Sequence, residues 1–259
     1  MKLDYVPLLQ TMRDLHRMPL GRARFGEYLR TLTNEDGSDL ELTPLLMMNP
    51  MGKDHVTALL DALLAMDADG IGKSAAEEAS AALADVPGEF KSCLVIADDL
   101  KGGWTNRYAY EFNHRNWYST RESRFWVTGL LWSSETPSAG TVREAVLTAA
   151  FRTAYIREHG FAGTLRELLD QEGQVLARAG CTAPALDDEE IAYTREVIRP
   201  CLDARDMRTQ IECLFGDEAG RTLGFTPRGL SKWAGLALAL HDAKGRGPVK
   251  RTGLTRTAS

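Results

Sequence analysis

Two short, continuously apolar runs stand out in the pattern of hydrophobic and polar positions along the chain. The first covers residues 92–97 and is followed by Asp98 and Asp99; the second covers residues 125–132. Neither run alternates between apolar and polar residues, and both are rich in large apolar side chains. This pattern is typical of strands that are covered on both faces. The two runs therefore predict two buried strands.

A third strand is predicted between them, at residues 106–112. Alternation places Tyr108, Tyr110 and Phe112 on one face of this segment, as in a strand. A third strand would also stabilise a sheet that two strands alone leave marginal. We then expect a hairpin turn at residues 101–103 and an antiparallel meander.

A helix is the alternative for the same segment. Helical spacing would stack Trp104, Tyr108 and Phe112 along one side, and it would pair Glu111 with Arg115. The strand is favoured because Tyr110 extends the two-residue alternation.

Most of the remaining chain shows the periodicity and end signals of helices. An apolar run at residues 45–52 is stopped by Pro50 and fits either a short strand or a buried loop. Capping boxes at 141–144 and 164–167 predict two helix starts, and Gly160 and Gly180 predict the corresponding ends. We expect helices at residues 4–17, 19–32, 53–66, 73–84, 141–159, 164–179, 187–202, 204–215 and 227–244, with a short piece to 223.

These elements predict an α+β fold that is predominantly helical, with about ten helices around a small, about three-stranded, mainly antiparallel sheet. We expect one globular domain over residues 1–243. A division near residue 88, with helices before it and the sheet plus helices after it, is also compatible with the pattern. Residues 244–259 are predicted to form a disordered basic tail.

Charge is unevenly distributed along the chain. The net charge is −5, whereas the tail carries five basic residues and no acid, so residues 1–243 carry −10. Binding to nucleic acid relies on a basic face, and an acidic body argues against that class of partner.

The sequence also predicts a cytoplasmic protein. No apolar run approaches the ~20 residues that span a bilayer, and the N-terminus lacks the features of a signal peptide. The four cysteines are scattered without metal-ligand spacing, which favours reduced structural thiols over disulfides or a zinc site. No metal site is predicted.

Four residues are candidates for acid–base catalysis: Asp98, Asp99, Glu111 and His114. Paired carboxylates at a strand end can bind a cation or act as a base. Glu111, three residues before His114, could orient that imidazole. The alternative interpretation is structural: turn and cap aspartates, and a partly buried histidine.

Five residues near them are candidates for substrate binding: Arg107, Arg115, Trp104, Tyr108 and Trp117. Two guanidiniums beside aromatic walls could hold a carboxylate or phosphate. The same residue types also form ordinary ion-pair and cation–π networks, and they dominate protein-binding hot spots.

Two functions follow from these candidates. The first is an enzyme that acts on a small polar or anionic molecule, with its site in residues 98–117. The second is a non-catalytic ligand- or protein-binding module that uses residues 104–118. No motif in the sequence identifies a reaction, a cofactor or an oligomeric state.

Overall fold

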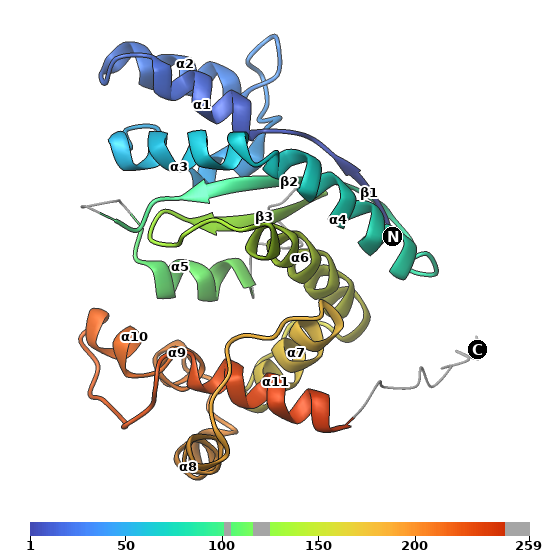
Figure 1. The fold of residues 1–259 in the computed structure, drawn as a ribbon, viewed down its shortest axis with the longest axis vertical. Helices are drawn as coiled ribbons and strands as arrows, with labels where there is room; N and C mark the ends of the chain where they lie inside the picture. The colour runs from blue at the N-terminus through green and yellow to red at the C-terminus, as the bar shows by residue number, and fades with distance from the viewer. Residues whose placement is uncertain (101–104, 116–124, 247–259) are drawn as a thin grey trace. The chain divides into compact units, whose positions relative to one another are not determined.

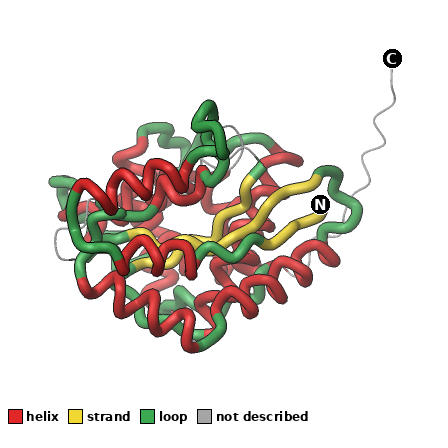
Figure 2. The backbone as a smooth tube through the Cα atoms, turned by 90° about the horizontal axis from the view of Figure 1, so that it is seen from above, coloured by secondary structure: helices red, strands yellow, loops and turns green. Residues whose placement is uncertain are grey.

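The sheet consists of parallel strands in the order β1–β2–β3 within the residues that the structure, a computed structural model, describes: 1–100, 105–115 and 125–246. The strands are β1 (Lys2–Tyr5), β2 (Glu89–Ala97) and β3 (Trp126–Trp132). β2 lies between the other two, as Figures 1 and 2 show. The register pairs Lys2 with Glu89, and it pairs β2 with β3 from Lys91–Trp126 to Ala97–Trp132. The prediction of two buried strands is confirmed.

The predicted antiparallel meander is wrong. The connection from β2 to β3 contains a helix, α5 (Arg107–Asn113), where a strand was predicted. Asn106 caps this helix by accepting a hydrogen bond from the backbone N–H of Ala109 at 3.0 Å. The hairpin turn predicted at residues 101–103 lies outside the described residues. Parallel strands require a long crossover rather than a tight turn, and the chain between β2 and β3 is long enough for one.

Both faces of the sheet are covered, which explains why β2 and β3 are continuously apolar. On one face, α4 (Ala68–Ala82) packs against β1 and β2, and α6 (Ala139–His159) packs against β2 and β3. On the other face, η1 (Thr43–Met47) packs against β2 and β3, and Tyr110 of α5 meets Trp132 edge to face.

The N-terminal residues form β1 instead of the start of the predicted helix at 4–17. The backbone N–H of Val6 donates to the carbonyl of Ser92 at 2.7 Å, which extends the pairing with β2. Pro7 follows, and a residue before proline disfavours the helical conformation. Helix α1 (Leu9–Arg17) therefore begins only after the proline.

Several predicted helix ends are confirmed and others move. The capping box at Thr164 is present, since Thr164 and Glu167 each bond the other's backbone N–H. The box predicted at 141–144 is wrong: Ser138 forms the capping box with Thr141, and α6 begins two residues earlier than 141. Of the apolar run at 45–52, residues 45–47 belong to the 3₁₀-helix η1 (Thr43–Met47), and residues 48–52 lie in the turn and loop that follow it. The remaining helices are α2 (Arg22–Leu32), α3 (Asp54–Ala65), α7 (Leu165–Arg178), α8 (Asp188–Ile198), η3 (Arg199–Cys201), α9 (Met207–Phe215), α10 (Asp217–Thr222) and α11 (Ala234–Arg246).

The chain divides into two compact units. The N-terminal unit comprises residues 1–163 and 178–180 and holds the sheet; the C-terminal unit comprises residues 164–177 and 181 onward and is helical in its described part. The predicted single domain over 1–243 stays a prediction. Of the predicted tail, residues 244–246 belong to α11, and residues 247–259 lie outside the described residues.

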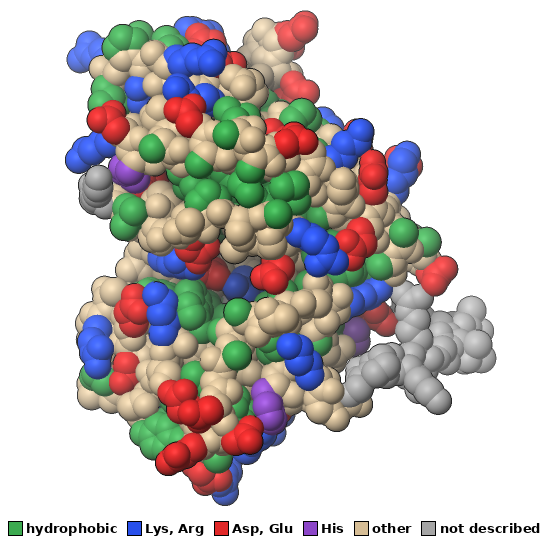
Figure 3. Space-filling model, viewed as in Figure 1, with side chains coloured by type: hydrophobic (Ala, Val, Ile, Leu, Met, Phe, Trp, Pro, Cys, Tyr) green, Lys and Arg blue, Asp and Glu red, His purple; other side chains and the backbone are tan. Residues whose placement is uncertain are grey.

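Charges on the face drawn in Figure 3 are mixed, with acidic and basic side chains interspersed. Across the described residues, no helix combines the length and the apolar character needed to cross a membrane.

Close packing of α6 on the sheet depends on Gly129 in β3. A Cβ atom at this position would lie 2.9 Å from Cδ2 of Leu94 and 3.2 Å from the backbone of Ala145 and Val146 in α6. Gly129→Val should force the helix away from the sheet and lower Tm by roughly 2–12 °C, as overpacking predicts. Thermal unfolding followed by circular dichroism measures this change.

The matched control is Gly26→Ala in α2, where the new Cβ meets nothing closer than 4.0 Å. This variant should melt no lower than the wild type, because alanine favours the helix over glycine. Equal melting of the Gly129→Val variant and the wild type would contradict the packing described here.

Candidate functional site

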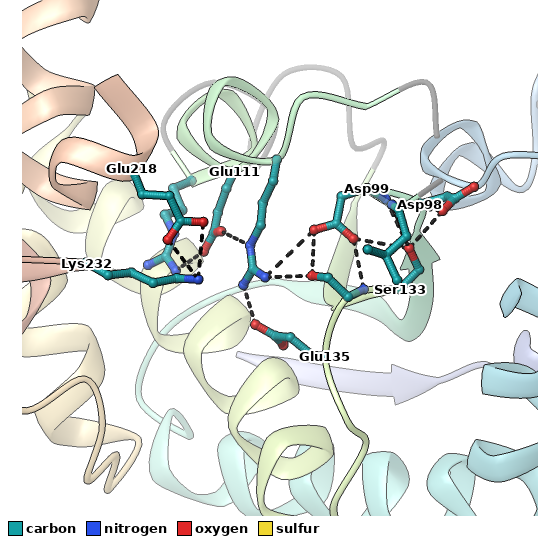
Figure 4. A network of polar contacts seen from close by, with 11 residues as sticks. Asp98, Asp99, Glu111, Ser133, Glu135, Glu218 and Lys232 are labelled. Atoms are coloured by element: carbon teal, nitrogen blue, oxygen red, sulfur yellow. Dashed lines mark hydrogen bonds and ion pairs between the residues drawn. The ribbon is translucent and has the colours of Figure 1, made fainter. Parts of the chain in front are cut away.

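Polar side chains collect where β2 and β3 end, at the carboxyl edge of the sheet. Asp98 and Asp99 follow the last residue of β2, and Ser133, Ser134 and Glu135 follow the last residue of β3. Because the strands are parallel, the two groups lie side by side (Figure 4). We call the connected set the strand-end network; its members are Asn49, His55, Asp98, Asp99, Arg107, Glu111, Arg115, Ser133, Ser134 and Glu135.

Asp98 is the buried centre of one half of this network, with 1% of its surface exposed. Its Oδ1 accepts a hydrogen bond from His55 Nε2 at 2.7 Å and another from the hydroxyl of Ser133 at 2.7 Å. Its Oδ2 accepts a hydrogen bond from Nδ2 of Asn49 at 2.9 Å. Burial alone would raise the pKa of Asp98, but these hydrogen bonds outweigh it and hold the pKa below the ordinary value. The carboxylate is therefore ionised at neutral pH.

His55, near the start of α3, is held by Asp98 through one ring nitrogen. A nitrogen that bonds to a carboxylate carries its proton, so in the neutral ring the lone pair lies on the other nitrogen, Nδ1. Nδ1 of His55 is buried and has no hydrogen-bond partner in the described part of the chain. The pair thus has an anchored side, at Nε2, and an Nδ1 lone pair that no described protein group bonds to.

Ser133 joins the two aspartates. Its hydroxyl accepts hydrogen bonds from the backbone N–H groups of Asp99 at 3.1 Å and Leu100 at 3.3 Å. The same hydroxyl lies 2.7 Å from Asp98 and 3.1 Å from Asp99, and its single proton can go to only one carboxylate at a time. Asp99 also accepts from the backbone N–H of Ser134 at 2.9 Å and from its hydroxyl at 2.7 Å.

Arg107 of α5 forms the centre of the other half. Its guanidinium donates to Ser134 at 3.0 Å, pairs with Glu135, and lies 3.5 Å from Glu111 and 3.8 Å from Asp99. Burial alone would lower the pKa of Arg107, but the acidic neighbours raise it above its ordinary value. The charge of this arginine is thus already neutralised by the protein's own carboxylates.

The structure unites four of the predicted site residues directly: Asp98, Asp99, Arg107 and Glu111. Arg115 joins through its ion pair with Glu111, which the helical alternative had anticipated. His114 lies at the end of α5, and a catalytic role for it stays a prediction.

Of the three aromatic residues predicted to bind substrate, the structure describes only Tyr108. Tyr108 is 4% exposed and belongs to the apolar core. Trp104 and Trp117 lie outside the described residues. Within the described ranges, no three His, Cys, Asp or Glu side chains are arranged to hold a metal ion.

Comparisons with known proteins give one short similarity. The chain is 34% identical over 76 residues to a protein of Bacillus subtilis (strain 168) described as "Uncharacterized protein YjfC". The match covers 29% of this chain and 24% of that protein, so the chain spans about a quarter of the relative it matches. No family model and no solved structure matches the chain.

Sequence reasoning missed His55, Asn49 and the segment after β3. Ser133, Ser134 and Glu135 had a detectable signal, since they follow an apolar strand as Asp98 and Asp99 do. His55 and Asn49 had none, because only the folded chain brings η1 and α3 to the end of β2.

The lowered pKa of Asp98 predicts a specific acid dependence of stability. A carboxylate whose pKa is depressed on folding stabilises the fold above its unfolded pKa of ~3.9, and that contribution is lost as the pH falls through the lower, folded pKa. Asp98→Asn should therefore lower the urea midpoint at pH 7, and the difference from the wild type should shrink between about pH 5 and pH 2.

Asp203→Asn serves as the control, because that carboxylate pairs with Arg166 at the surface and is 88% exposed. It should change the urea midpoint little. A difference between the Asp98→Asn variant and the wild type that stays constant down to pH 2 would contradict the assignment.

Proposed function

We propose that the N-terminal unit is an acid–base enzyme that binds a small polar molecule at the strand-end network. His55 would exchange a proton with the ligand through Nδ1, which is buried in the structure and would have to be uncovered when the ligand binds. Asp98 would anchor the imidazole and stabilise its protonated form. The observation that carries this proposal is the pair of the partly buried His55 and the buried Asp98, 2.7 Å apart at the carboxyl end of a parallel sheet. Ligands of parallel α/β sheets bind at that end, since the loops that follow the strands converge there.

Anchoring supports a catalytic interpretation of the pair over a purely structural one. Asp98 is held by Asn49 and Ser133 as well as by His55, and Asn49 is itself fixed by a bond from the backbone N–H of Met51 at 3.0 Å. An imidazole held by such a carboxylate keeps a defined tautomer and orientation, which proton transfer requires.

Charge in the network favours a ligand that donates hydrogen bonds over an anion. The described members include four carboxylates and two guanidiniums, and Arg107 already faces Asp99, Glu111 and Glu135. An anionic ligand would have to displace one of these carboxylates from the arginine. Of the two ligand classes predicted from the sequence, a polar molecule with hydroxyl or ammonium groups fits these contacts better.

The proposal includes a cytoplasmic location and no nucleic-acid partner. The four cysteines support the location, because all of them are free thiols in the structure. Free, mostly buried thiols persist in reducing compartments.

Ligand class can be tested with three compounds that share one carbon frame: propane-1,3-diol, 3-aminopropan-1-ol and 3-hydroxypropanoate. Titrated into the isotope-labelled full chain, the diol and the amino alcohol should shift the NMR signals of Leu100, Ser134 and the His55 ring. The carboxylate should shift them less, because the network repels it. The stronger response to 3-hydroxypropanoate would overturn the charge argument, and no response at these residues to any compound would overturn the site.

Two variants test the assigned roles, and a third is the control. His55→Gln and Asp98→Asn should each reduce the response of Leu100 and Ser134 at least threefold, because each removes one member of the pair. Arg221→Gln, at an exposed position on α10, should leave it unchanged. If both His55→Gln and Asp98→Asn keep the full response, the His55–Asp98 pair does not take part in ligand binding and its assigned role is wrong.

A further inference from the structure

A second polar site lies in the C-terminal unit, where helices α7, α8 and α11 surround a cavity of about 540 Å³. This volume falls within the range of small-molecule sites, about 300–1,000 Å³. We call it the arginine-lined cavity. Every residue that lines it belongs to the C-terminal unit, so it is separate from the strand-end network.

The inner wall of the arginine-lined cavity is apolar. Ile198, Leu238 and Ala239 contribute to it, and each is at most 4% exposed. Leu169 of α7 and Leu202 are only partly buried and form the accessible part of this wall. A ligand that fills the cavity would therefore bury hydrocarbon surface against it, which is favourable at roughly 25 cal/mol per Å².

Basic groups exceed acidic groups around the same cavity. Four guanidiniums line it, against two carboxylates, Asp170 and Asp242. The arginines come from four elements, α7, α8, η3 and α11, in that order: Arg166, Arg195, Arg199 and Arg246.

The two lining carboxylates hold two of the arginines in place. Arg195 bonds to Asp242 through both terminal nitrogens, at 2.8 Å and 2.7 Å, and Arg246 bonds to Asp170 at 2.8 Å. The guanidinium of Arg195 keeps the pKa of Asp242 below its ordinary value. These two pairs tie α8 and α7 to α11 and leave the other two arginines as the adjustable part of the lining.

Arg166 and Arg199 are paired with acids that do not line the cavity. Arg166 meets Asp203 at 3.2 Å and Arg199 meets Glu196, and all four side chains are at least 60% exposed. Exposed pairs of this kind are worth only about 0–1 kcal/mol. A ligand carrying negative charge can therefore take over these two guanidiniums at little cost, and guanidinium binds carboxylate and phosphate groups well.

We propose that the arginine-lined cavity binds a small organic anion with an apolar body. Its carboxylate, sulfate or phosphate head would bond to Arg166 and Arg199, and its hydrocarbon part would lie mainly against Leu169 and Leu202. The ligand class thus differs in charge from the neutral or cationic molecules that the strand-end network favours.

Three probes separate the two parts of this proposal: octanoate, octan-1-ol and inorganic phosphate. Isothermal titration of the full chain should show saturable binding of octanoate, with octan-1-ol and phosphate each at least tenfold weaker. Equal affinity for octanoate and octan-1-ol would show that the arginines do not contribute to binding. Equal affinity for phosphate and octanoate would remove the role of the apolar wall, and no binding of octanoate would overturn the proposal.

Substitutions test the location. The double variant Arg166→Gln/Arg199→Gln should weaken octanoate binding roughly tenfold, as the loss of charged hydrogen bonds predicts. The fold should remain intact because both pairs are exposed, and unchanged Tm checks this. Arg221→Gln, an exposed arginine on α10 that does not line the cavity, should bind octanoate as the wild type does.

Gly245→Phe provides a second variant that does not depend on charge. Gly245 lines the cavity, and a Cβ atom there meets nothing within 4 Å, so the backbone accepts a side chain at this position. This variant should keep its Tm and lose octanoate binding at least tenfold. Wild-type affinity in both the double variant and Gly245→Phe would show that octanoate binds elsewhere and would overturn the proposal.

Discussion

Parallel pairing of β2 with β3 is the constraint on which the N-terminal unit depends. In a parallel pair both strands end at the same edge, so the polar residues that follow each strand become neighbours. This places Asp98 and Asp99 beside Ser133 and Ser134, within hydrogen-bond distance. The crossover between the strands carries α5, whose Arg107 reaches the same edge. An antiparallel hairpin would have put the two groups at opposite ends of the sheet.

Electrostatic balance then distinguishes what the two units can bind. In the strand-end network, carboxylates outnumber guanidiniums, and the central Arg107 is enclosed by its own acids. Asp98 stays ionised despite burial only because His55, Asn49 and Ser133 donate to it. In the arginine-lined cavity the excess is reversed, and the carboxylates that pair with Arg166 and Arg199 are exposed. Under the two proposals, one chain would carry a site for hydrogen-bond donors and another for anions.

The sequence predicted β2 and β3, but it missed β1, placed a strand where α5 lies, and did not predict how the strands pair. The absence of polar alternation in 92–97 and 125–132 indicated burial on both faces, and that pattern is itself typical of parallel strands. The antiparallel prediction came from the alternation of Tyr108, Tyr110 and Phe112, which was given more weight than the possible i,i+4 pair of Glu111 and Arg115. The helix cap at Asn106 was not part of the prediction. Local pattern is ambiguous over seven residues, whereas a cap and i,i+4 ion pairs are specific to a helix.

The candidate site was predictable only where its residues adjoin a strand or share a helix turn. Asp98 and Asp99 follow a strand, and Arg107 and Glu111 are four residues apart on α5. His55 reaches Asp98 from 43 residues away in the sequence, and nothing local marks it. Its contact depends on how α3 packs, which no pattern of apolar and polar positions encodes. The arginines of the cavity in the C-terminal unit were unpredictable for the same reason. They lie on separate elements, and in the sequence each resembles an ordinary charged residue on a solvent-exposed helix face.

Interstrand nuclear Overhauser effects between β2 and β3 test the central claim most directly. Parallel register predicts contacts between the backbones of Lys91 and Trp126 at one end and of Ala97 and Trp132 at the other. An antiparallel pair would reverse this pattern and bring Lys91 close to Trp132. The first pattern supports the shared strand end on which the site is built, and the second would contradict it.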